Sequence, residues 1–199
     1  MAAVRELQTG LWYWESSHPD WTPRNPEDEG ATVTSYAIDE GERLLLIDPL
    51  ALPREIEELA ADRETAIVLT CAWHERDARS LAERLDTVVF VPSPEEGEPI
   101  QGRQLFSAGD RLPVGVSAYP GKDENDLALW VDSHRALAVG DTLIERGGRL
   151  QIPEDWLSDG VTREQVVALL RPLLELPVEL VLPTHGAPTD RAALERTLS

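Results

Sequence analysis

The stretch Ala66-Ile-Val-Leu-Thr-Cys-Ala-Trp-His-Glu-Arg-Asp77 joins a short apolar run to a group of polar side chains. The apolar run follows a polar turn, and beyond the stretch Leu81 and Leu85 recur at helical spacing. This pattern predicts a buried strand that leads through a loop into a helix. We therefore expect His74 and Asp77 to lie just past the carboxyl end of a strand.

Two later apolar runs end in the same way. Residues 136–139 lead to Asp141, and residues 178–183 lead to His185. In sheets of this kind, ligand-binding side chains gather outside the carboxyl ends of the strands. We expect the polar residues that follow these three strands to meet at one edge of a sheet.

Length and composition limit the kind of protein this can be. The chain has 199 residues, enough to bury a large core in a single domain, 1–199. Its start lacks an apolar signal region, and no uncharged apolar stretch approaches the ~20 residues of a membrane span. We expect a soluble cytoplasmic protein with no membrane partner, and the sequence leaves the oligomeric state open.

The charge balance is strongly acidic. Lys and Arg number 18 against 37 Asp and Glu, a formal net charge of −19. Such a surface repels nucleic acid backbones, so we expect a small-molecule substrate and no nucleic-acid partner. Cys71 is the only cysteine, which excludes an intramolecular disulfide and a thiolate zinc cluster. It is most simply a small buried apolar residue.

Hydrophobic periodicity predicts strands followed by helices in both halves of the chain. Expected strands cover 11–15, 32–39, 43–48, 66–69, 87–91, 104–106, 114–119, 127–131, 136–139 and 180–182, and expected helices cover 54–61, 79–85, 162–174 and 190–198. This order fits two sheets packed face to face with helices on the outside. The sequence thus predicts an α/β (α+β) fold, a four-layer αββα sandwich.

Three short motifs resemble those of the metallo-β-lactamase superfamily, whose members form an αββα sandwich and bind one or two metal ions at the sheet edge. The motifs are Leu45 to Leu50, Val139 to Leu143, and Leu182 to Gly186. The resemblance covers most of the chain. It implies that Asp48 is a structural acceptor that holds the ligand loop, that Asp141 is a metal ligand, and that His185 is another.

The chain departs from the family's main signature, Thr-His-x-His-x-Asp-His. When Asp77 is aligned with the aspartate of that signature, its three histidine positions fall on Trp73, Glu75 and Ala78. His74 is then one position out of register, yet near enough to join the ligands. In the family's Pro-Gly-His motif, Lys122 stands in place of the histidine. The resemblance therefore implies a depleted set of metal ligands.

The ligands that remain under this alignment are His74, Asp77, Asp141 and His185. Two carboxylates and two imidazoles suit a single Zn²⁺, Mn²⁺ or Fe²⁺ ion with open positions. Such an ion lowers the pKa of its bound water toward ~7 and polarises a carbonyl group. Asp77 would hold or deprotonate that water. The resemblance implies a hydrolase that cleaves an ester, thioester, lactam or lactone bond.

An alternative follows from Lys122, the only lysine among the 18 basic residues. The alignment places its ammonium beside Asp77 and Asp141, where it can balance carboxylates that are costly to bury. The site is then metal-free, and the protein is a catalytically silent module that binds a small molecule or a partner protein.

Trp73 is expected in the wall of an apolar substrate cleft. A nucleic-acid-processing member of the superfamily is disfavoured by the charge.

Each candidate also has a plainer interpretation. Asp141 can be a turn residue that bonds to its own backbone, and Asp77 can cap the helix that follows it. His74 and Lys122 can be partly exposed polar residues in turns. The separations among these side chains distinguish the interpretations.

Overall fold

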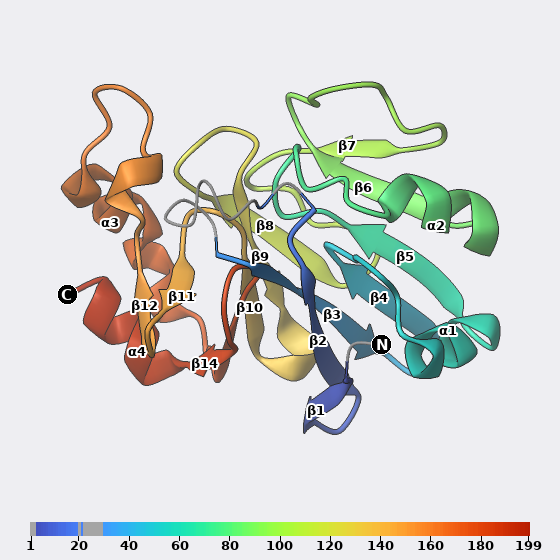
Figure 1. Cartoon of the computed structure of the whole chain (residues 1–199). Coiled ribbons are helices and arrows are strands. Elements are labelled where there is room, and N and C mark those ends of the chain that lie inside the picture. The colour runs from blue at the N-terminus through green and yellow to red at the C-terminus, as the bar shows by residue number, and fades with distance from the viewer. Residues whose placement is uncertain (1–2, 20, 22–29) are drawn as a thin grey trace.

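Two large β-sheets and four α-helices form four layers in the computed structural model, which describes residues 3–19, 21 and 30–199. The helices are α1 (Arg54–Ala61), α2 (Ala78–Leu85), α3 (Arg163–Leu170) and α4 (Arg191–Thr197). Figure 1 shows α1 and α2 on the outer side of one sheet, and α3 and α4 on the outer side of the other. These layers confirm the αββα sandwich predicted from the sequence.

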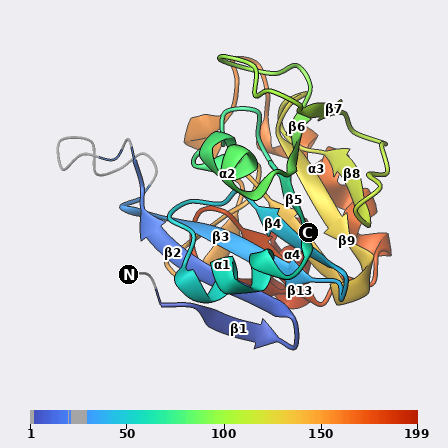
Figure 2. The same ribbon diagram turned by 90° about the vertical axis from the view of Figure 1, so that its right-hand side faces the viewer.

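The first sheet follows the order of the chain. Its strands are β1 (Arg5–Gln8), β2 (Leu11–Ser17), β3 (Thr32–Asp39), β4 (Arg43–Ile47), β5 (Glu64–Val68), β6 (Val88–Pro92) and β7 (Gln104–Phe106). Strands β1 to β4 are antiparallel neighbours, whereas β4 to β7 run parallel. Parallel strands need a crossover, and α1 and α2 supply two of them. Figure 2 shows these helices in front of the sheet.

The second sheet has the strand order β14-β13-β10-β9-β8. Its strands are β8 (Val116–Pro120), β9 (Leu127–Val131), β10 (Ala136–Val139), β13 (Leu180–Pro183) and β14 (Thr189–Asp190). Strands β10 and β13 pair in parallel, so the residues that follow them leave the sheet at the same end. This pairing places the loops that carry Asp141 and His185 side by side.

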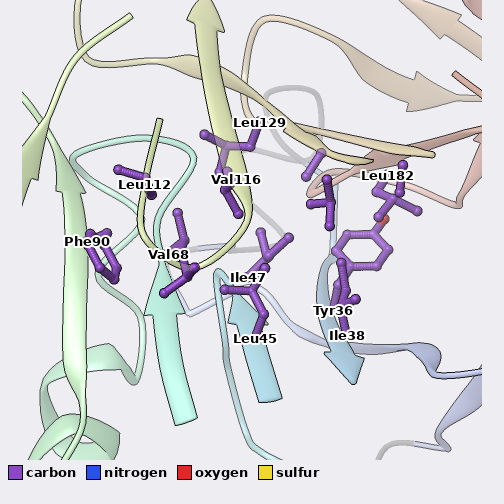
Figure 3. Packing of buried hydrophobic residues seen from close by; sticks show 14 of the residues in the cluster. Tyr36, Ile38, Leu45, Ile47, Val68, Phe90, Leu112, Val116, Leu129 and Leu182 are labelled. Carbon is purple, nitrogen blue, oxygen red and sulfur yellow. The ribbon is translucent and has the colours of Figure 1, made fainter. Parts of the chain in front are cut away.

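Alternating side chains divide the apolar residues into three clusters. In β4, Leu45 faces the second sheet, whereas Leu44 faces α1 and α2. Figure 3 shows the cluster between the sheets, where Val68 of the first sheet lies near Val116 and Leu129 of the second. A third cluster joins the second sheet to α3 and α4. Each fully buried Leu or Val contributes about 1.5–3 kcal/mol.

The structure differs from the sequence-based expectation at several places, among them the short strands β1 and β14, which were not expected. The helix expected over 162–174 is α-helical only to Leu170 and continues as a 3₁₀ helix, Arg171–Glu175, because Pro172 has no N–H to donate. The hairpin of β11 (Ile144–Arg146) and β12 (Arg149–Gln151) was not expected. Its two-residue Gly147-Gly148 turn, with φ of 62° and 80°, is a hairpin signal that the sequence does contain. Within the described residues, no helix combines the length and apolar character that crossing a bilayer requires.

Arg76 connects the two sheets. Its Nη1 donates to the carbonyl oxygens of Thr34, at 2.9 Å, and Asp48, at 2.8 Å, and its Nη2 lies 3.4 Å from that of Thr184. Thr34 lies in β3 of the first sheet, and its own N–H donates to the Thr184 carbonyl at the end of β13, at 2.9 Å. The guanidinium therefore holds together strand ends from both sheets.

We expect Arg76→Lys to lower the free energy of unfolding by about 2–4 kcal/mol. A lysine has one nitrogen and cannot reproduce a planar fork that reaches three carbonyl oxygens, so buried acceptors lose their donors. Urea denaturation measures the change. Arg84→Lys is the matched control, because within the described part of the chain Arg84 forms only an exposed ion pair with Glu57. Equal stability of the two variants would contradict the role assigned to Arg76.

Candidate functional site

Three loops bring His74, Asp141 and His185 together. Nε2 of His74 and Nε2 of His185 each lie 3.2 Å from Oδ1 of Asp141. Asp141 and His185 each follow by two residues the last residue of β10 or β13, whereas His74 comes from the loop after β5. The cluster therefore lies where the ends of the two sheets meet.

Asp48 sets the orientation of the His74 ring. Its side chain is fully buried, and Oδ2 lies 2.7 Å from Nδ1 of His74. The backbone N–H of Thr70 donates to Oδ1 at 2.8 Å, and the Thr70 hydroxyl donates to Oδ2 at 2.5 Å. Because Nδ1 faces Asp48, Nε2 is the ring atom that faces Asp141.

The charges of the cluster are strongly coupled. Burial alone would lower the pKa of His74, but Asp48 and Asp141 on its two sides outweigh burial and raise the pKa to about 9. Burial alone would raise the pKa of Asp141, but the charge of His74 and the contact with His185 hold it well below its usual range. Burial opposes ionisation of Asp48 too, and His74 again lowers its pKa. Without a bound ion, His74 is an imidazolium between two carboxylates.

The two oxygens of Asp141 have different surroundings. Oδ2 accepts a hydrogen bond from Nε1 of Trp73 at 2.8 Å. Oδ1 is buried, and no donor among the described residues is aligned for a hydrogen bond to it, although two imidazole nitrogens lie at 3.2 Å. The contacts of Oδ1 are therefore electrostatic, and the atom keeps an unused lone pair.

Aromatic rings form a row across the cluster. The ring of His74 lies 6.2 Å from that of Trp73 and 5.5 Å from that of His185, centroid to centroid. The His185 ring lies 5.4 Å from Trp156 and 5.8 Å from His18. Trp73 is 37% exposed, which places an indole face at the solvent side of the row.

Cys71 and Asp126 form a buried pair that sequence reasoning did not assign to the site. The Cys71 thiol donates to Oδ1 of Asp126 at 3.3 Å, and the Thr142 hydroxyl donates to Oδ2 at 2.8 Å. Burial raises the pKa of the Cys71 thiol well above its usual range, and burial with the nearby Asp141 raises the pKa of Asp126 to about 7. Sequence gives no sign of this contact, because it joins residues 55 positions apart in different sheets.

Lys122 does not make the contacts expected from the alignment. Its Nζ pairs with Oδ2 of Asp123 at 2.8 Å and lies 5.5 Å from the centre of the Trp73 ring. Burial would lower its pKa, but the bond to Asp123 and the charges of Asp126 and Asp141 raise it. The ammonium therefore acts on Asp141 through its charge, without a hydrogen bond between them.

The Asp77 carboxylate is bonded away from the cluster, and its assignment as a metal ligand and the catalytic carboxylate stays a prediction from the sequence. Its Oδ2 accepts the backbone N–H of Ala51 at 2.6 Å, and its side chain lines a pocket between α1 and α2. Arg76 adopts a left-handed backbone, with φ of 44°, so the chain turns between His74 and Asp77. Asp77 stands at the N-cap position of α2 without a side-chain capping bond.

The side chains present fit a metal ion. Cys71, His74 and Asp141 offer ligand atoms within 4.8 Å of one another, and His185 reaches the same Asp141 oxygen. Atoms bound at about 2.0–2.1 Å to one tetrahedral ion are separated by roughly 3.3 Å, close to the two contacts of Asp141 Oδ1. The bond between Asp48 and Nδ1 of His74 resembles the carboxylate–histidine pair that commonly supports a metal ligand.

Solved structures with the same arrangement of elements are metallo-β-lactamases. The DIM-1 metallo-β-lactamase is 12% identical, with a TM-score of 0.72 over 99% of this chain and 95% of that chain. The Pontibacter korlensis enzyme is 15% identical, with a TM-score of 0.69 over 100% and 97%. The Hirschia baltica enzyme is 17% identical, with a TM-score of 0.67 over 99% and 96%. Scans against protein-family models and curated protein sequences find no match.

These likenesses confirm the metallo-β-lactamase fold expected from the sequence motifs. They also show how far this chain has diverged, because identities of 12–17% accompany nearly complete coverage. The fold places its candidate site at the end of the two sheets, where His74, Asp141 and His185 meet.

We expect the metal-free protein to become less stable as the pH rises from 6.5 to 9. The folded-state pKa of His74 is raised from 6.5 to about 9, so its contribution is fully present below pH 6.5 and is lost as the pH passes 9. The loss is on the order of 3 kcal/mol. Urea denaturation across this range measures it. His74→Gln should flatten the dependence and His134→Gln should not; equal slopes in both variants would refute the assignment.

We expect Gly140→Ala to destabilise the protein by about 3 kcal/mol, because overpacking of a buried site forces its neighbours apart. An added Cβ would overlap Cys71 Sγ and come within 2.8 Å of Thr70 Oγ1. Gly147→Ala is the control: its Cβ meets nothing within 4 Å, and only its positive φ opposes the change. Thermal unfolding compares the two variants. A smaller loss of stability for Gly140→Ala than for Gly147→Ala would contradict the prediction, because it would show that Cys71 and Thr70 move aside.

Proposed function

We propose that this protein is a hydrolase that uses at most one bound metal ion, held by Cys71, His74, Asp141 and His185. The substrate is a small molecule with an ester, thioester, lactam or lactone bond. The observation that carries the proposal is the meeting of two imidazole nitrogens at a buried carboxylate oxygen with no aligned donor. The likeness to solved metallo-β-lactamases supports the same class of reaction.

The donor set favours zinc. Imidazole, thiolate and carboxylate are all zinc ligands. A catalytic zinc site uses three protein ligands and keeps one position open for water, so three of these four residues suffice. Mn²⁺ and Fe²⁺ accept the imidazoles and the carboxylate but gain less from a thiolate. An ion bound here would lower the pKa of its water and polarise a substrate carbonyl.

Trp73 supports a single ion rather than two. Its N–H is bonded to Oδ2 of Asp141, the oxygen that a second ion would need for bridging. The Lys122 ammonium lies 5.5 Å from the centre of the Trp73 ring, and its charge would repel a second positive ion nearby. The pair of Trp73 and Lys122 therefore fills the space beside the proposed ion.

The residues of the chain prepare the ligands for the ion. Asp48 accepts from Nδ1 of His74, which leaves the lone pair of Nε2 for the metal. The Cys71 thiol must lose its proton to coordinate, and Oδ1 of Asp126 lies 3.3 Å away as its acceptor.

The surroundings suit a neutral or weakly charged substrate of small size. Trp73 and Trp156 stand at the two ends of the ring row and offer flat apolar walls. A groove of ≈ 780 Å³, a volume typical of small-molecule sites, is lined by Lys122 but by none of the four proposed ligands. The net charge of −19 opposes nucleic acids. A cytoplasmic location remains a prediction from the sequence.

A second candidate function is a catalytically silent binding module, and the high pKa of His74 favours it. At neutral pH without metal, the imidazolium already balances Asp48 and Asp141. The compensating charge in this version comes from His74 rather than from Lys122. Metal binding separates the two candidates.

We expect one tightly held zinc per chain by elemental analysis and calorimetric titration at pH 8. Asp141→Asn and His185→Ala should weaken zinc binding by at least about tenfold, because loss of one ligand costs 1.4 kcal/mol or more. His134→Ala, in the 3₁₀ turn Asp132–His134, is the control. Hydrolysis of chromogenic ester, thioester, lactone and β-lactam substrates should follow zinc content. No binding at saturating zinc would support the silent module instead.

A further inference from the structure

A second pocket lies on the outer side of the second sheet, away from the candidate site. It has a volume of ≈ 610 Å³ and is formed by β12 with the turn before it, the first residue of α3, and α4. Its charged lining residues are Arg149, Arg163 and Arg196, and no acidic residue lines it. In a chain with 37 acidic and 18 basic residues, a pocket whose charged lining residues are all arginines is unusual.

The three arginines differ from other exposed arginines of this protein. Arg54 pairs with Glu58 at 2.8 Å, Arg84 with Glu57 at 3.2 Å, and Arg135 with Glu179 at 2.5 Å. Among the described residues, no carboxylate forms an ion pair with any arginine of the pocket. Glu164 lies near Arg163 in sequence and feels its charge, but it does not line the pocket.

The pocket is held in shape by hydrogen bonds. Nη2 of Arg163 donates to the carbonyl oxygen of Thr197 at 2.8 Å, which fixes the guanidinium at the rim. The Thr197 hydroxyl donates to the carbonyls of Leu150, at 2.7 Å, and Ala193, at 2.9 Å. Thr197 therefore joins α3, α4 and β12, and the position of the Arg163 guanidinium is set before a ligand binds.

We propose that this pocket binds a small phosphate-bearing anion through Arg149, Arg163 and Arg196. Guanidinium groups present planar pairs of N–H donors that match the oxygens of phosphate, and they keep their charge at every physiological pH. Three such groups repel one another until an anion with more than one charge enters. The volume matches small-molecule sites, and the site is independent of the proposed hydrolase activity.

Calorimetric titration with inorganic diphosphate tests the proposal. The full-length chain is freed of metal and then dialysed into chloride buffer without chelator, because a chelator would compete as a polyanion. We expect one diphosphate per chain and an affinity at least about tenfold higher than for acetate. Equal heats for diphosphate and acetate would overturn the proposal.

Matched variants locate the binding. Arg149→Gln with Arg196→Gln removes two exposed charges without touching the bonds of Thr197, and it should weaken diphosphate binding at least about tenfold. Arg54→Gln removes an exposed charge on α1 and should leave the affinity unchanged. Thermal unfolding confirms that each variant is folded. Undiminished binding by the double variant, or an equal loss in the control, would overturn the proposal.

Discussion

A buried carboxylate that must be satisfied organises the candidate site. Asp48 is fully enclosed, and an ionised carboxylate in such a place costs several kcal/mol unless it is bonded. It obtains its bonds from Thr70 and His74, which draws the loop after β5 down onto the end of β4. The backbone of Asp48 is itself left-handed, with φ of 43°. The position of His74 follows from these requirements.

Both sheets contribute to the site, so the joint between them matters as much as the ligands. His74 belongs to the first sheet, whereas Asp141 and His185 follow strands of the second. Arg76 bonds to carbonyls of both, and the N–H of Leu127 donates to the Thr70 carbonyl at 2.8 Å beside the site. A small slip of one sheet against the other would separate the His74 imidazole from Asp141.

Sequence patterns were sufficient where the relevant contacts follow from strand periodicity. Asp141 and His185 come together because β10 and β13 are parallel neighbours, and apolar runs ending in polar residues predict that arrangement. Asp77 was chosen by matching residue type to a motif, and in the structure its carboxylate bonds to the backbone N–H of Ala51, after the left-handed turn at Arg76. Lys122 was placed by alignment without knowledge of Asp123 as its partner. Cys71 and Asp126 meet only through the packing of distant segments.

A proton and the proposed metal ion compete for the same atom, Nε2 of His74. With Asp48 on one side and Asp141 on the other, a proton at Nε2 already supplies positive charge, so an entering ion must displace it into solvent. Acidification then works against loading, and alkaline conditions favour it. In the absence of the proposed ion, the proton on His74 balances the charges of Asp48 and Asp141, so the fold does not depend on metal to compensate these buried carboxylates.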